Sequence, residues 1–144
     1  MQKEQIYEVL NANPVFSLAT IDNGKPRVRG ILLYKADENG IVFHTGKMKD
    51  LYRQILEDPS AEMCFTDAKI GMQIRISGTL EIVEGREIKD EILNHPSRAF
   101  ARTWKDNGEM EEFYENFVVL CLKGGKAKTW TMQTNFEKAP EISL

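Results

Sequence analysis

The fold is decided by residues 15–35, VFSLATIDNGKPRVRGILLYK, which contain two β-strand-like runs on either side of a tight turn. The turn, Asp22-Asn23-Gly24-Lys25, supplies residues that adopt the left-handed backbone a two-residue hairpin needs. A second turn, ADENG at 36–40, leads into IVFHT at 41–45. These stretches predict a meander of three antiparallel strands.

The remaining segments predict further strands and short helices around this meander. Apolar residues recur at helical spacing in 3–12, 48–57 and 86–94. Strands are expected at 61–67, at 72–82, where apolar and polar residues alternate, and at 117–123 and 127–132, joined by a Lys-Gly-Gly-Lys turn as a terminal hairpin. The stretch 95–115 has no clear pattern, and its aromatic residues are expected to pack against the rest of the protein. Six or seven mainly antiparallel strands with peripheral helices predict a mainly β protein with a closed or nearly closed barrel.

Length and composition indicate one globular domain, residues 1–144. Apolar residues make up 42% and charged residues 28%, which excludes a disordered chain. The start, MQKEQIYEVLNANP, has no unbroken apolar stretch, so neither a secretory signal nor a membrane span is expected. Cys64 and Cys121 lie in apolar runs and are expected to be buried and free, which predicts a cytoplasmic protein. The net charge of −3 disfavours nucleic acid as a partner.

The first candidate site lies on the second strand, in Pro26-Arg27-Val28-Arg29-Gly30-Ile31. Alternation puts Arg27 and Arg29 on one face, beside a glycine that lets a flat ligand approach the backbone. Two guanidinium groups this close repel each other unless an anion or water lies between them. A solvated polar face on a hairpin strand is the alternative interpretation.

The second candidate is the strand-to-helix junction Thr45-Gly46-Lys47-Met48-Lys49. Free N–H groups at a helix start, the positive end of the helix dipole and two lysines together suit a phosphate group. A helix start with solvated lysines is the alternative.

The third candidate is Gln73, on the polar face of an alternating strand, because an amide can both donate and accept hydrogen bonds, as the polar edge of a flat ring ligand requires. Its alternative is an outward-facing strand residue. Trp130, in the last strand, is either core or a flat cover for a ligand. His44 and His95 have no cluster of Cys, Asp or Glu around them, so no metal site is expected. No serine-hydrolase, Walker or dinucleotide-type glycine motif is present.

Three stretches together carry a family resemblance: FSLATIDNGKPRVRGI (16–31), IVFHTGKMKDLYRQILEDPSAEMCF (41–65) and MQIRISGTLEIVE (72–84). They resemble the FMN-binding split-barrel family of the pyridoxamine 5'-phosphate oxidases, and more closely its short bacterial, nitroimidazole-resistance-like branch. The resemblance runs from about Asn13 to Trp130. It implies a six- to seven-stranded antiparallel split β-barrel that binds FMN.

The resemblance also implies which residues hold the cofactor. Arg29, with Arg27 beside it, matches the family's arginine, and the backbone of Gly30, Ile31 and Leu32 would run along the flavin. The remaining matches are Thr45 at a strand end, Lys49 with its neighbour Lys47 at the phosphate, Gln73 before a strand glycine, and Trp130 near the end of the chain.

Two departures from the family pattern bear on the activity. The full oxidases carry a Ser-Arg-Lys-like run where this chain reads Lys49-Asp50-Leu51. They also end in an arginine and histidine segment that grips the vitamin phosphate, whereas this chain has no histidine after His95. Oxidation of pyridoxamine phosphate is therefore not expected.

The function implied is an FMN-dependent oxidoreductase acting on a small molecule, with NAD(P)H as the electron donor and no residue that stands out as an acid or base. One alternative is a flavin or haem module without turnover, with His44 as the axial ligand. Another is an enzyme that uses a deazaflavin as an exchanging cosubstrate. The resemblance further implies a homodimer with each flavin between subunits, and Trp104 and Phe113 are the expected partner contacts.

Overall fold

The hairpin at the start of the chain forms as its turn residues predict. In the computed structural model, which describes all residues 1–144, β1 (Val15–Asp22) pairs with β2 (Lys25–Leu32) in continuous antiparallel register from Val15↔Leu32 to Asp22↔Lys25. Asn23 and Gly24 take up the turn with φ of 51° and 76°. This backbone is the left-handed one that Asn and Gly tolerate best.

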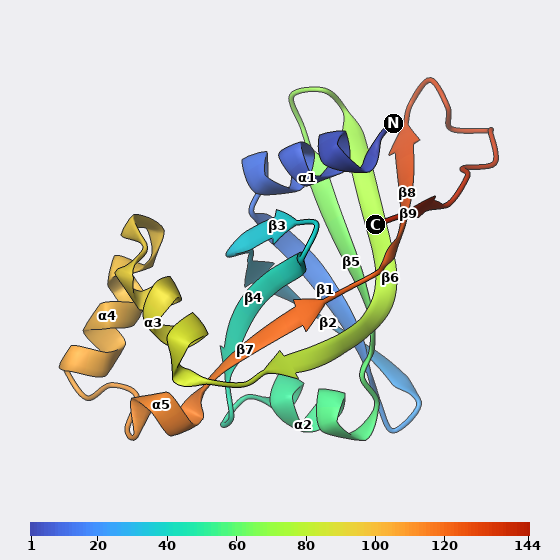
Figure 1. Ribbon diagram of the computed structural model, residues 1–144. Helices are drawn as coiled ribbons and strands as arrows, with labels where there is room; N and C mark the ends of the chain where they lie inside the picture. The colour runs from blue at the N-terminus through green and yellow to red at the C-terminus, as the bar shows by residue number, and fades with distance from the viewer.

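The other elements follow in the order shown in Figure 1. They are α1 (Lys3–Ala12), β3 (Lys35–Asp37), β4 (Gly40–Gly46), α2 (Asp50–Glu57), β5 (Ser60–Asp67), β6 (Met72–Val83), α3 (Arg86–Asn94), the 3₁₀ turn η1 (Pro96–Arg98), α4 (Ala99–Asp106), α5 (Phe113–Asn116), β7 (Phe117–Leu122), β8 (Lys126–Thr131) and β9 (Ile142–Ser143). The helices at 3–12, 48–57 and 86–94 and the strands at 61–67 and 72–82 are confirmed to within two residues.

One antiparallel sheet runs in the order β2-β1-β5-β6-β7-β4-β3, and β8 also pairs with β6. The long strand β6 joins its two halves: residues 72–77 lie between β5 and β8, and residues 80–83 pair with β7. Gly78 stands at the changeover, where a Cβ atom would come within 3.0 Å of Leu122. The sheet curls without closing, because β2 lies at the end of the order with one edge unpaired. The expected mainly β, antiparallel split barrel is confirmed, but its sheet has nine strands in place of the expected six or seven.

Two predicted strand pairings are wrong. The third strand of the expected meander, β4, pairs with β3 and β7 instead of β2. After β2 the chain bends away, and the N–H of Tyr34 donates to the carbonyl of Val42. The predicted terminal hairpin is also absent: β7 and β8 each pair with β6. Gly124 and Gly125 carry the chain between the two halves, and a Cβ on Gly125 would collide with Leu122 and Ile76.

Two hydrophobic cores lie on opposite sides of β4 and β7. The larger core fills the barrel beneath α1 and α2, and the smaller one packs the outer face of β4 and β7 against α3, α4 and α5. Every residue of β7 is therefore buried. Cys121 lies in the smaller core, whereas Cys64, on the outer face of β5, is only half-buried, so the prediction of burial is wrong there. None of the helices combines the length and apolar character needed to span a membrane.

Candidate functional site

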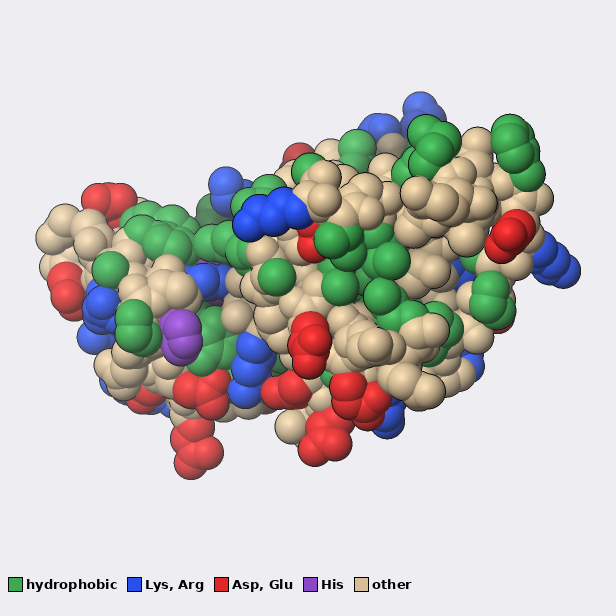
Figure 2. Space-filling model, turned by 90° about the horizontal axis from the view of Figure 1, so that it is seen from above, with side chains coloured by type: hydrophobic (Ala, Val, Ile, Leu, Met, Phe, Trp, Pro, Cys, Tyr) green, Lys and Arg blue, Asp and Glu red, His purple; other side chains and the backbone are tan.

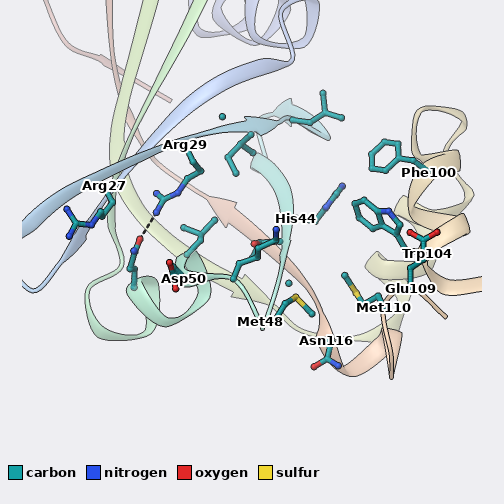
Figure 3. Close-up of a pocket in the computed structure, with 18 of the residues that line it drawn as sticks. Arg27, Arg29, His44, Met48, Asp50, Phe100, Trp104, Glu109, Met110 and Asn116 are labelled. Atoms are coloured by element: carbon teal, nitrogen blue, oxygen red, sulfur yellow. Dashed lines mark hydrogen bonds between the residues drawn. The ribbon is translucent and has the colours of Figure 1, made fainter. Parts of the chain in front are cut away.

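A cavity of about 1080 Å³ opens where the barrel is split. One wall is β2, the opposite wall is the end of β4, and the start of α2 forms the floor. The helix α4 and the loop after it line the remaining side, as Figure 3 shows. The volume is slightly above the ~300–1,000 Å³ usual for small-molecule sites.

Arg29 fixes the β2 wall to the floor. Its guanidinium donates to Thr20 Oγ1 at 2.7 Å and to Gln54 Oε1 at 2.5 Å, the bond drawn in Figure 3. The Thr20 hydroxyl donates to the same Gln54 oxygen at 2.7 Å, and both of these side chains are buried. Burial lowers the pKa of Arg29, but a guanidinium keeps its charge in proteins. Arg29 is thus both a structural link and a cation at the cavity wall.

Arg27 lies further out and is partly neutralised. Its Nε is 3.7 Å from Asp22 Oδ2, and Arg53 Nη1 lies 3.1 Å from the other oxygen of the same carboxylate. The hydrogen bond from Arg53 is the main reason why the pKa of Asp22 is lowered. All three side chains are accessible to water, so the charge of Arg27 is screened.

The floor begins at the strand-to-helix junction. Thr45 ends β4, and Lys49 stands at the N-cap of α2, where its side chain provides no acceptor for the N–H groups of the first turn. Helix N-termini of this kind bind anions through free N–H groups and the helix dipole. Asp50 occupies the next position and adds a negative charge nearby. The donor set of Lys49 and the helix start fits a phosphate group.

The far end of the cavity is aromatic. Phe100 and Trp104 of α4 lie 5.1 Å apart in an edge-to-face pair, and Trp104 faces the His44 ring at 6.4 Å. Met48 and Met110 complete this end. Burial, together with the nearby charge of Arg98, lowers the pKa of His44 to about 4, so the ring is neutral at physiological pH.

Seven of the ten predicted site residues line this cavity: Arg27, Arg29, Gly30, Ile31, Leu32, Thr45 and Lys49. Lys47 lines a separate cavity of about 400 Å³ beside α3. Gln73 and Trp130 sit opposite each other on β6 and β8 and line neither cavity. The indole N–H of Trp130 donates to Asn135 at 2.8 Å.

Several lining residues were missed from the sequence. Gln54 lies inside an amphipathic helix and gave no signal beyond its position on a mostly apolar face. Phe100 and Trp104 were expected only to pack, with Trp104 also a partner contact, and both line the cavity. Phe113 is buried in the smaller core, so its predicted role in contacting a partner is wrong.

The fold and the cavity together define a split-barrel protein with a cofactor-sized site in the split. The sequence pattern of the pyridoxamine 5'-phosphate oxidase family matches residues 2–131, and the chain belongs to this family. A curated relative, the pyridoxine/pyridoxamine 5'-phosphate oxidase of Sinorhizobium fredii, is 35% identical over 98 residues, which are 67% of this chain and 47% of the relative. The chain therefore spans about half the length of the curated relatives it matches.

Solved structures of similar fold cover nearly the whole chain. A NimC/NimA family protein of Clostridium acetobutylicum has a TM-score of 0.75 at 23% identity, covering 98% of this chain and 92% of that one. A pyridoxamine 5'-phosphate oxidase-related, FMN-binding protein of Nostoc punctiforme has a TM-score of 0.68 at 17% identity, with coverage of 99% and 95%. A haem-binding protein of Mycobacterium smegmatis reaches 0.71 at 19% identity, with coverage of 97% and 57%. These similarities establish the fold.

Proposed function

We propose that the chain binds FMN in the cavity at the split and acts as an FMN-dependent oxidoreductase on a small molecule. The observation that carries the proposal is the division of one large cavity into a basic helix start and a flat, open strand edge along β2, with the aromatic end beyond both. FMN has the same division, since it joins a phosphate of about −1.5 to −2 charges at neutral pH to a flat ring system. Family membership and the FMN-binding Nostoc protein support the choice of cofactor.

The side chains at the basic end would hold the phosphate. Lys49 and the free N–H groups at the start of α2 oppose its charge, and Thr45 provides a hydroxyl beside them. The β2 edge from Gly30 to Leu32 would lie along the ring, because a Cβ on Gly30 would meet no atom within 4 Å and the backbone there is open. The bound flavin supplies the redox chemistry, and the protein binds, orients and shields it. NAD(P)H is the proposed electron donor.

The rival is a flavin or haem module without turnover. The haem-binding Mycobacterium protein favours it, with His44 as the axial ligand. An axial ligand must offer a ring nitrogen lone pair. The lone pair on Nε2 of His44 already accepts a hydrogen bond from Arg98 Nε at 3.0 Å, which weighs against haem.

We extend the proposal to a homodimer in which each chain completes its partner's site. Gln73 is exposed and Trp130 half-buried on one face of the β6–β8 pair, away from the cavity of their own chain. Beside them, apolar side chains project into solvent, including Met132 at 69% exposure and Phe136 at 98%. Figure 2 shows exposed apolar side chains at the right-hand end of the molecule, where the β8–β9 loop lies in Figure 1. Such a patch on a small protein marks an interaction surface.

The free cysteines accord with a cytoplasmic location.

The test begins with the absorbance spectrum of the purified protein, before and after FMN and then NAD(P)H are added. We expect a flavin spectrum that NAD(P)H bleaches, and FMN bound at least tenfold, or ~1.4 kcal/mol, more tightly than riboflavin, which lacks the phosphate. A Soret band would establish the haem rival. Equal affinity for FMN and riboflavin would refute the phosphate site.

Light scattering and subunit mixing test the dimer. Lys49→Ala chains and chains carrying Gln73→Ala with Trp130→Ala should each bind FMN weakly. If the two sets of residues serve one site from different chains, mixing and subunit exchange should restore about one quarter of the sites, since half of the dimers are hybrids with one intact site each. No recovery in exchanged dimers, or a flavin-loaded monomer, would refute the shared site.

A further inference from the structure

Arg98 is a buried cation without a counter-ion. Its side chain is 2% exposed, and it takes part in none of the ion pairs of the molecule. Its guanidinium instead donates to the carbonyl of Leu33 at 2.8 Å and to Ser97 Oγ at 3.0 Å. The rings of Tyr34 and Phe100 lie 5.5 and 5.6 Å from its centre. Burying an unpaired charge costs free energy, so this arrangement calls for a reason.

The remaining donor of Arg98, its Nε, determines which nitrogen of the His44 ring carries the hydrogen. Arg98 Nε donates to His44 Nε2 at 3.0 Å, so Nε2 carries the lone pair. A neutral imidazole has one N–H, and here it must be on Nδ1. Nδ1 has no hydrogen-bond partner within the protein. Every buried side-chain nitrogen and oxygen of the molecule does have a partner, so Nδ1 is not buried and can be reached from outside the protein. His44 itself lines the cavity.

We propose that Arg98 is a positioning residue that holds His44 as a neutral Nδ1–H donor, and that this donor binds an uncharged carbonyl oxygen of a flat ligand at the aromatic end of the cavity. The inference deepens the proposed function, on which it rests, because the flavin would occupy the rest of the cavity. The positive charge behind the ring polarises the Nδ1–H bond and strengthens it as a donor. Phe100 and Trp104 supply the flat walls.

Arg98 lies behind the His44 ring at Nε2, and the charges that line the aromatic end of the cavity disfavour a carboxylate at Nδ1. Besides Arg98 from η1, the ionisable groups that line the same cavity are Asp22, Arg27 and Arg29 around the β1–β2 hairpin, Lys49 and Asp50 at the start of α2, and Glu109 and Glu111 in the loop after α4. The elements packed directly on the ring are α4 and β7, which present Phe100, Trp104 and Phe117. The cations that line the cavity, Arg27, Arg29 and Lys49, belong to its basic end. Glu109 lies beside Trp104 at the aromatic end (Figure 3) and would repel a carboxylate.

The first experiment reads the tautomer directly by ¹⁵N NMR of the imidazole nitrogens, in the apo and the FMN-loaded protein. The chain has only two histidines, so a His95→Asn variant assigns the spectrum. His44 should show the neutral Nδ1–H form from pH 8 to pH 5. In Arg98→Met its pKa should rise from about 4 toward the ordinary 6.5, with mixed tautomers, and Arg98→Lys should restore part of the difference.

An Nε2–H form in the wild type, a charged His44 at pH 6, or an unchanged spectrum in Arg98→Met would each overturn the proposal. If Arg98→Met fails to fold, the wild-type spectrum still tests the proposal, because it shows the tautomer and the charge of His44 directly. The apo measurement separates this inference from the proposed function, because it does not depend on flavin binding.

The second experiment titrates FMN-loaded protein with benzamide, benzoate and toluene as probes, measures their affinities by calorimetry and, in the wild type, follows the His44 Nδ1 resonance. Benzamide should bind most tightly, and His44→Phe should weaken it about tenfold, the worth of one hydrogen bond, without changing toluene binding. Equal affinities for benzamide and toluene, or benzamide binding unchanged in His44→Phe, would overturn the carbonyl site. If FMN itself does not bind, the proposed function fails while the tautomer result stands.

Discussion

β2 and β4 flank the same cavity and are built in opposite ways. β2 ends the sheet with an unpaired edge, and its residues from Lys25 to Val28 are all exposed. β4 is paired on both sides, and its residues 40–43 are all buried. The site thus combines a wall whose exposed side chains, Arg29 excepted, can change freely with a wall held by two cores. A ligand group opposite β4 meets a donor whose position is fixed, whereas one opposite β2 meets residues that, apart from Arg29, can be altered with little effect on the fold.

The largest difference should appear in stability. Phe43 of β4 is fully buried and packs edge-to-face on Phe16 at 5.7 Å, so Phe43→Ala should cost about 3–5 kcal/mol. Val28 of β2 is 70% exposed, and Val28→Ala should change the unfolding free energy by no more than about 0.5 kcal/mol. Urea denaturation of both variants measures the contrast. A large, concentration-dependent loss at Val28 would show that a second copy covers β2.

The next effect concerns the basic end. Lys49→Ala should weaken FMN binding by about 1.5–3 kcal/mol, the worth of a hydrogen bond to a charged group, which is about ten- to more than hundredfold. Riboflavin affinity should stay the same, because the lost partner is the phosphate. Calorimetry with both ligands makes the measurement.

Lys47→Ala is the matched control at the same junction. Its side chain lines the second cavity, so its effect on FMN should be small. Arg29→Ala is less clean as a test, because it also leaves the buried Thr20 and Gln54 without their cation. Equal losses at Lys47 and Lys49 would indicate a general electrostatic effect and no direct contact with the phosphate.

The β4 side predicts a pH dependence of stability. The pKa of His44 is about 4 in the folded protein and 6.5 in the unfolded chain, so the unfolded state binds more protons below pH 6.5. Stability should therefore be lost as the pH falls from 6.5 toward 4, by about 2 kcal/mol between pH 7 and pH 5. His44→Gln keeps an acceptor for Arg98 but does not titrate. Its unfolding free energy should therefore not show this fall between pH 7 and pH 5. Parallel slopes in the two proteins would contradict the neutral, buried His44.

The same contrast explains what the sequence could reveal about the site. The β2 wall and the helix start are local features: a turn, an alternating strand and a strand-to-helix junction lie within 28 residues, from Asp22 to Lys49. Their residues could therefore be predicted from spacing alone. The role of Arg98 could not be predicted, because its partners His44 and Leu33 lie 54 and 65 positions away along the chain. Only the packed smaller core brings them together.

Strand pairing shows the same limit. Local turn chemistry correctly predicts the β1–β2 hairpin but also suggests the meander and the terminal hairpin that do not form. Both errors arise where the chain passes between the two halves of the barrel. At the end of the chain the pairing is decided by β6, which pairs with β8 and then β7 along one edge, and after β2 it is decided by β7, which pairs with β4. Alternation in residues 72–82 predicts which side chains are buried, but not that the strand changes partner near Gly78 and serves both halves of the sheet.

The smallest predicted effect tests whether the β2 backbone contacts the ligand. A side chain at Gly30 would meet no atom within 4 Å in the protein, and the residue does not need positive φ. Gly30→Val should therefore leave the fold intact, since valine suits an edge strand better than glycine. If the flavin ring lies along this edge, the new side chain should occupy part of its space and weaken FMN and riboflavin equally, by about tenfold or ~1.4 kcal/mol. Titration of both ligands, with a thermal melt of each variant, makes the measurement. Lys25→Ala, at the start of the same strand and outside the cavity lining, is the control. Unchanged affinities in Gly30→Val would place the ring against β4 and the aromatic end instead of along β2.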